Sequence, residues 1–153
     1  MTSGLSLLSL ALTFPLWSQS NSDSSPAPVQ IVTRIGNINT LGNTSLFLEV
    51  HNTSSKNVTG YSLEVRFIDP STKAALKGSH GRMAAKRASP LRPGDCDCSN
   101  SKPIVIKKTA SGALAEPQVI IDLVVFDDGT TWGAGRLLLS RGLLKELGVT
   151  QTQ

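Results

Sequence analysis

The chain has 153 residues, of which 39% are hydrophobic and 17% are charged. This composition excludes an intrinsically disordered chain, and the length fits one domain that can fold without a metal or a set of disulfides. The formal net charge of +4 is uneven, because residues 73–108 contain nine basic and two acidic side chains and carry +7.

Residues 1–20 are predicted to be a secretory signal peptide. Leu5–Trp17 is an apolar run of 13 residues, shorter than the roughly 20 residues that cross a bilayer, so no transmembrane span is expected. Ser18 and Ser20 are small residues placed as at a cleavage site, although residues 1–4 lack Lys and Arg. A secreted or periplasmic protein is therefore expected, with a buried N-terminal strand or helix as the alternative.

The next segments predict a linker and then strands. Residues 21–28 are rich in Ser, Asn and Pro and indicate a flexible linker. Strands are expected at 29–38, 45–50 and 58–68. The third strand alternates Tyr61, Leu63, Val65 and Phe67 with Ser62, Glu64 and Arg66, which is the period-2 pattern of a half-buried strand.

The second half of the chain predicts further strands and one helix. Residues 71–93 are ambiguous, with a short edge strand near 79–84, and Ile104–Lys107 is a short strand. Gln118–Phe126 is almost continuously apolar, which favours a strand buried on both sides. Asp128-Gly129 predicts a hairpin with a two-residue loop, returning through 130–133. Leucines spaced along 137–147, followed by Gly148, predict a short C-terminal helix.

About seven short strands separated by turns predict an all-β sandwich. The motifs HNTSSKNVTGYSLEVRFIDPSTK, LRPGD and VIIDLVVFDDGTTWG fall between His51 and Gly133. This segment resembles a class of small exported bacterial immunoglobulin-like β-sandwich proteins, mostly uncharacterised. The resemblance implies an immunoglobulin-like antiparallel sandwich over 29–136, with 137–153 as the C-terminal helix and tail, and it implies almost no activity. The chain departs from antibody domains, since no Cys pair could bridge two distant strands.

Cys96-Asp97-Cys98 is the most conspicuous chemical feature. In an extended strand these cysteines would lie about 6.6 Å apart on one face, near the upper limit for a disulfide, so a bond needs a local turn. A structural disulfide is the expected interpretation, with a redox or intermolecular pair and half of a metal site as alternatives. Neither His51 nor His80 has the usual ligand spacing, so the sequence predicts no metal site and no cofactor.

The sequence predicts no catalytic site. Ser79, in Gly-Ser-His-Gly, lacks the elbow pattern of a hydrolase, and Ser99-Asn100-Ser101-Lys102 lacks the accompanying motifs of a penicillin-binding enzyme. No combination of nucleophile, base and acid can be assembled.

The basic residues predict a partner-binding surface. Residues 73–92 carry six cations and no acid, namely Lys73, Lys77, Arg82, Lys86, Arg87 and Arg92. These cations favour binding to a protein or to an anionic cell-envelope component. The alternative is that they lie in a solvated loop that protects a sheet edge. Nucleic acid is not favoured, since no aromatic residues are interleaved. The function that follows is an exported, non-catalytic binding or structural module. The alternative is an extracytoplasmic thiol-redox or metal-handling protein that uses Cys96 and Cys98. The sequence does not define an oligomeric state.

Overall fold

The structure is a computed structural model that describes residues 26–37, 44–98 and 103–150, without the side chains of residues 37 and 78–80. The predicted signal peptide and linker residues 21–25 lie outside these ranges. Eight strands and one helix occur in the described part: β1 (Val29–Asn37), β2 (Thr44–Asn52), β3 (Val58–Ile68), β4 (Ala75–Leu91), β5 (Cys96–Asp97), β6 (Ile104–Val105), β7 (Glu116–Phe126), β8 (Thr131–Trp132) and α1 (Leu138–Leu147).

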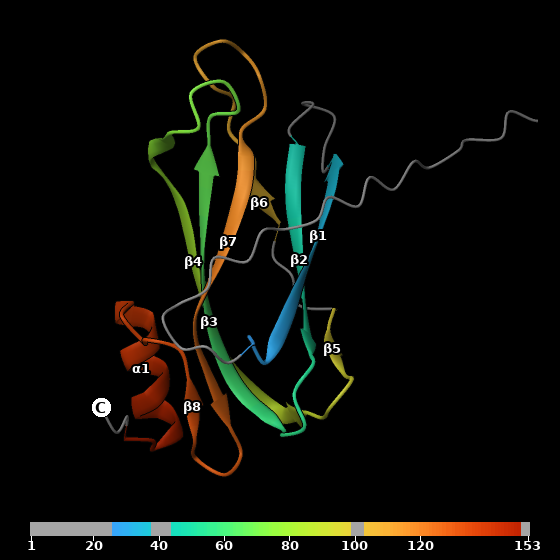
Figure 1. Ribbon diagram of the computed structural model, residues 1–153, viewed down its shortest axis with the longest axis vertical. Coiled ribbons are helices and arrows are strands. Elements are labelled where there is room, and N and C mark those ends of the chain that lie inside the picture. Colours follow the sequence, from blue (N-terminus) through green and yellow to red (C-terminus); the bar gives the residue numbers. More distant parts are fainter. Residues whose placement is uncertain (1–25, 38–43, 99–102, 151–153) are drawn as a thin grey trace, which may run out of the picture.

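The strands form two antiparallel sheets (Figure 1). In the first sheet β2 pairs with β1, β5 and β6, and in the second the order is β4-β3-β7-β8. Alternate residues of both sheets meet in one apolar core, since a strand presents every second side chain to the same face. The core contains Leu46, Leu48 and Val50 from β2, Tyr61, Leu63, Val65 and Phe67 from β3, and Val124 and Phe126 from β7. The prediction of an all-β chain with two packed sheets is confirmed.

Strand β3 has the predicted boundaries, but its burial differs from the prediction. Tyr61, Leu63 and Val65 face the core as expected, whereas Ser62 and Glu64 on the opposite face are also buried. The prediction of a half-buried strand is therefore wrong for the middle of β3, because a second layer covers part of that face.

Helix α1 supplies this second layer on the outer face of the β4-β3-β7 sheet (Figure 1). Leu143 packs with Leu123 and Val125 of β7 in a separate apolar cluster. The helix approaches β3 closely at Gly60, where a Cβ atom would lie 3.0 Å from Leu147 Cδ1 and 3.1 Å from Leu143 Cδ1. A larger residue at this position would push the helix off the sheet.

Specific residues explain where α1 begins and where it ends. Asp122 of β7 accepts hydrogen bonds from the backbone N–H groups of Arg136 (3.0 Å) and Leu137 (2.9 Å) and from the Ser140 hydroxyl. This carboxylate therefore satisfies donors at the N-terminal end of the helix, where negative charge is favourable. Gly148 ends the helix in the left-handed conformation, as the sequence predicts.

Strand β4 is longer than the sequence indicates. The predicted short edge strand near 79–84 is part of a 17-residue strand at the edge of its sheet. Its pairing with β3 is interrupted between Lys86 and Leu91, where four residues of β4 lie opposite Thr59 alone. The basic composition concealed a strand, because exposed edge positions accept Lys and Arg.

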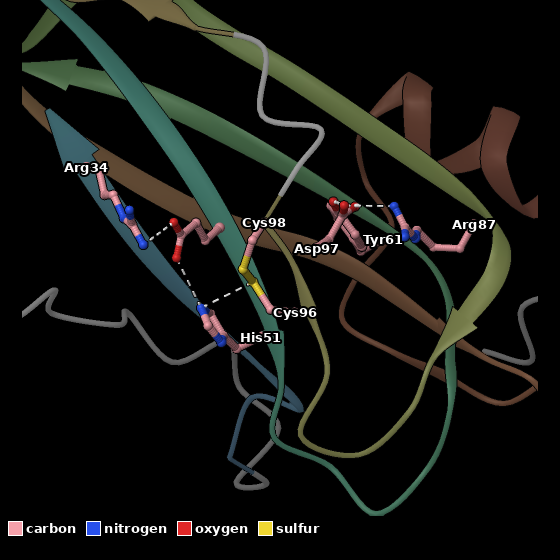
Figure 2. The surroundings of a disulfide bond; sticks show 8 residues. Arg34, His51, Tyr61, Arg87, Cys96, Asp97 and Cys98 are labelled. Carbon is pink, nitrogen blue, oxygen red and sulfur yellow. Dashed lines mark hydrogen bonds and ion pairs between the residues drawn. A yellow bond between two sulfur atoms is a disulfide. The ribbon is translucent and has the colours of Figure 1, made fainter. Parts of the chain in front are cut away.

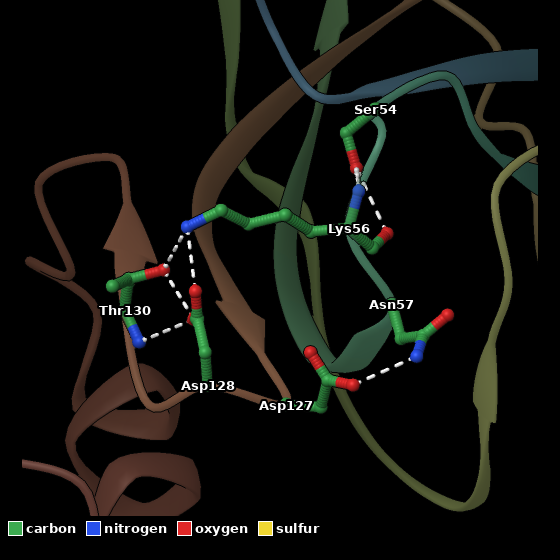
Figure 3. A network of polar contacts seen from close by, with 6 residues as sticks. All are labelled: Ser54, Lys56, Asn57, Asp127, Asp128 and Thr130. Atoms are coloured by element: carbon green, nitrogen blue, oxygen red, sulfur yellow. Dashed lines mark hydrogen bonds and ion pairs between the residues drawn. The ribbon is translucent and has the colours of Figure 1, made fainter.

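The β7–β8 hairpin has a three-residue loop, so the prediction of a two-residue loop is wrong. Phe126 N–H donates to the carbonyl oxygen of Thr130 at 3.0 Å, and Gly129, with φ of 78°, occupies the left-handed position. Lys56 of the β2–β3 turn binds Asp128 in this loop at 2.6 Å (Figure 3). Hydrogen bonds from Lys56 and Thr130 hold the pKa of the Asp128 carboxyl well below its usual range.

Candidate functional site

The short strand β5 places the Cys-Asp-Cys sequence against β2. A turn at 91–94 precedes it, with Gly94 at a φ of 84° and the N–H of Asp95 donating to the Arg92 carbonyl oxygen at 2.9 Å. In the β2–β5 register Cys96 lies opposite His51 and Asp97 lies opposite Val50. Because Val50 faces the core, Asp97 points inward and its two neighbours point outward.

Cys96 and Cys98 form a disulfide pair on the outer side of this sheet. Their Cα atoms are 5.3 Å apart, closer than the value of about 6.6 Å for an extended strand. The shortened spacing brings the cysteines into the ordinary range for a disulfide. The backbone between the two cysteines is therefore less extended than a regular strand, as a bond between them requires.

His51 and Glu49 of β2 complete a four-residue cluster with the cysteines (Figure 2). His51 Nε2 lies 3.5 Å from Cys96 Sγ and 3.4 Å from Glu49 Oε2. Arg34 of β1 binds the other carboxylate oxygen, Glu49 Oε1, at 2.7 Å. The four residues offer two sulfurs, one imidazole nitrogen and one carboxylate oxygen as ligand atoms. These four atoms all lie within 4.8 Å of one another.

The sequence predicts no ligand role for His51, because His51 lacks the usual spacing from other ligands. The side chain is 34% exposed and contacts the disulfide. Spacing rules compare ligands along the chain, whereas here the antiparallel register joins residues 45 positions apart. The usable signal was the alternation Glu49-x-His51 on β2 and Cys96-x-Cys98 on β5, since each pair shares a face of its strand.

Asp97 makes a polar link between the two sheets on the inner side of β5 (Figure 2). It is 4% exposed, accepts a hydrogen bond from the Tyr61 hydroxyl at 2.7 Å, and forms an ion pair with Arg87 at 2.8 Å. Burial and the interaction with Asp97 raise the pKa of the Tyr61 hydroxyl. Sequence reasoning missed this link, because the partners come from three strands and no spacing connects them.

The six cations of the predicted partner-binding surface have different environments. Lys73 pairs with Glu116 at 3.2 Å, and Arg82 lies 3.5 Å from Glu64. The Lys73–Glu116 pair is exposed at both side chains, so it contributes about 1 kcal/mol or less to stability, whereas the Glu64 carboxylate is buried.

The remaining four cations divide between the two sides of β4 and the following turn. The Arg87 side chain is only 21% exposed, because it turns inward to Asp97. Lys77 and Lys86 are exposed, and Lys86 donates to the carbonyl oxygen of Glu146 at 3.3 Å. Arg92 is exposed in the turn before β5. Arg82 and Lys86 share the outer side of the strand by alternation, and Lys77 joins them because the pairing shifts between residues 75 and 80 and Leu76 packs against the core.

The two serine motifs fall outside the part of the chain whose side chains the structure describes. The side chains of Ser79 and His80 and all of residues 99–102 lie outside the described part. Comparison with protein-family models, curated proteins and solved structures found no match to this chain. Among the described residues, no helix is both long and apolar enough to cross a membrane.

Proposed function

We propose that this protein is an exported, non-catalytic, immunoglobulin-like binding module that engages an anionic cell-envelope component through the outer side of β4. The signal-like N-terminus and the resemblance of residues 51–133 to small exported bacterial proteins support export and the immunoglobulin-like assignment. The observation that carries the binding proposal is the exposure of Lys77, Arg82 and Lys86 along a long edge strand, whose irregular pairing with β3 between residues 75 and 80 brings Lys77 to the same side as the other two.

The physical basis is the accumulation of positive charge on one side of a strand. Lys77 and Lys86 are exposed, and Arg82 is partly balanced by Glu64. Arg66 lies on the same face as Glu64 and binds it at 2.7 Å, so two guanidinium groups share one carboxylate. This face therefore retains excess positive charge, which attracts polyanions and anionic headgroups in a salt-dependent way.

A vesicle-binding experiment tests the proposal. Binding of the protein to vesicles of phosphatidylglycerol and phosphatidylcholine is measured by co-sedimentation at increasing salt. A Lys near an anionic lipid surface contributes about 1 kcal/mol, so Lys77→Gln with Lys86→Gln should weaken binding by about thirtyfold. Lys107→Gln with Lys108→Gln is the matched control, since it removes the same charge from exposed positions outside β4.

The control should weaken vesicle binding by much less than the β4 variant. Equal losses in the two double variants would assign binding to net charge alone and would remove the role of β4. Binding to neutral vesicles as strong as to anionic vesicles would contradict the proposal altogether.

A further inference from the structure

We propose that, once the disulfide is reduced, Glu49, His51, Cys96 and Cys98 bind one zinc ion on the outer face of the β1-β2-β5 sheet. This site is separate from the proposed binding face on β4, and its test does not depend on that proposal. The four side chains supply two thiolates, one imidazole and one carboxylate, which are the groups that tetrahedral Zn²⁺ sites use.

The distances in the cluster already match those of a tetrahedral zinc site. With Zn–S of about 2.3 Å and Zn–N and Zn–O near 2.1 Å, tetrahedral angles require about 3.6 Å between sulfur and nitrogen and about 3.4 Å between nitrogen and oxygen. The corresponding distances are 3.5 Å from Cys96 Sγ to His51 Nε2 and 3.4 Å from His51 Nε2 to Glu49 Oε2. Two of the distances between ligand atoms therefore already suit a shared metal, and all four ligand atoms lie within 4.8 Å of one another.

The two sulfur atoms must separate once the disulfide is reduced. They need to separate from a bond of about 2.05 Å to about 3.8 Å, the distance between two thiolates on one tetrahedral zinc. Cys98 is exposed at the end of β5, so its side chain can turn outward without disturbing the core. The backbone of β5 remains fixed by its pairing with β2 and by Asp97 on the inner side.

The net charge of the four ligands and Arg34 also favours binding of Zn²⁺. Two thiolates and one carboxylate give −3, Zn²⁺ adds +2, and Arg34 at 2.7 Å from Glu49 supplies the remaining positive charge. Arg34 binds Oε1 and leaves Oε2 directed at His51, so it orients the carboxylate from outside the ligand set. Such outer contacts fix ligand geometry in metal sites.

The reaction that opens the site needs a two-electron reductant, and a dithiol serves as the example. The reductant gives two electrons and two protons to the Cys96–Cys98 disulfide, which becomes two thiols, while the reductant itself becomes a disulfide. Zn²⁺ then replaces the two thiol protons, which pass to solvent. A disulfide oxidant that takes two electrons from the thiolates, and with two protons from solvent becomes two thiols, re-forms the Cys96–Cys98 bond and releases Zn²⁺, so the site couples zinc binding to thiol redox state.

Zinc titration of both redox forms of the full chain tests the proposal. The protein is reduced with a phosphine that is removed without oxygen, and affinity is measured by competition with a chromophoric zinc chelator. Native mass spectrometry gives the stoichiometry. We expect one Zn²⁺ per reduced chain and an affinity at least about a hundredfold lower for the disulfide form, since zinc requires deprotonated thiolates.

Ligand variants locate the ion. His51→Gln and Glu49→Gln should each weaken zinc binding to the reduced chain by at least about tenfold, because loss of even an outer-shell partner typically costs that much. Gln30→Ala is the matched control, since Gln30 lies opposite His51 in β1 and contributes no ligand. Thermal unfolding of each variant checks that the sheet remains folded.

Co²⁺ provides a readout that does not depend on variants. Bound to the reduced wild-type chain, it should give the intense visible bands of a tetrahedral ion and a thiolate charge-transfer band. Octahedral cobalt bands would overturn the proposal. Equal zinc affinity of the oxidised and reduced chains would overturn it too, as would unchanged affinity in both His51→Gln and Glu49→Gln.

Discussion

The two sides of β5 have opposite chemistry although their residues are consecutive. Cys96 and Cys98 point outward to His51, where the side chains are partly exposed, while Asp97 points inward to Arg87 and Tyr61 between the sheets (Figure 2). The period of two in a strand separates a reactive cluster from a buried link within three residues. The comparison indicates that the inner side supports the fold and leaves the outer side free for chemistry.

The largest loss of stability is expected from a variant that removes the buried link on the inner side of β5. Asp97→Ala leaves the Arg87 guanidinium and the Tyr61 hydroxyl without their carboxylate in a region that is 4% exposed at Asp97. Removing one partner of a buried ion pair costs about 3 kcal/mol or more, since the other charge remains desolvated. Urea denaturation followed by tryptophan fluorescence measures this loss.

Glu116→Ala is the control for this variant. It also removes one carboxylate, but the Glu116 side chain is 57% exposed in its pair with Lys73, and such a pair is worth about 1 kcal/mol or less. Similar free energies of unfolding for Asp97→Ala and Glu116→Ala would show that the inner side of β5 has no special structural role.

A smaller effect is expected when only the hydroxyl is removed. Tyr61→Phe deletes the 2.7 Å hydrogen bond to Asp97, and a hydrogen bond to a charged group contributes about 1.5–3 kcal/mol. Arg87 still neutralises Asp97 in this variant. The loss in urea denaturation should therefore be smaller than that of Asp97→Ala, and an equal loss would mean that Arg87 contributes nothing.

Tyr61 also makes the free energy of unfolding depend on pH. Its raised pKa means that the folded protein retains the hydroxyl proton at a pH where the unfolded chain has lost it. This contribution to stability is complete below a pH of about 10, the ordinary tyrosine pKa, and declines above it. Tyr61→Phe should remove this part of the alkaline decline. Because the chain has one Tyr, ultraviolet titration of tyrosinate reports this group directly, and ionisation near pH 10 in the folded protein would contradict the explanation.

Local patterns were sufficient to predict most of the elements. β3 begins and ends where its alternation does, and α1 ends at Gly148 as expected. Two packed antiparallel sheets follow from the turn spacing and the alternation. The long edge strand β4 was underestimated because Lys and Arg at alternate positions reduce its apolar signal.

The candidate site was less predictable, for a physical reason. Cys96 and Cys98 are conspicuous in the sequence, but His51 and Glu49 come into contact with them only through the register of β2 and β5. A one-residue shift in that register would place Asp97 opposite His51 and direct the cysteines inward. Single-sequence patterns predict strands better than the alignment between them, so the four ligands could not be grouped in advance.

The smallest loss of stability is expected in a comparison of two arginines, Arg34 and Arg87, which bind carboxylates on opposite sides of the β1-β2-β5 sheet. Arg34 is 71% exposed and binds Glu49, whereas Arg87 is 21% exposed and binds Asp97, at distances of 2.7 and 2.8 Å. If burial decides the contribution, Arg34→Ala should lower the free energy of unfolding by about 1 kcal/mol or less, while Arg87→Ala should cost several times more. Denaturation at low and high salt measures both, and added salt should further reduce the small difference between Arg34→Ala and the wild type. Equal costs for the two variants would mean that the outer cluster is as important to folding as the inner link. In that case the outer side of β5 could not be assigned to chemistry on the ground that the fold leaves it free.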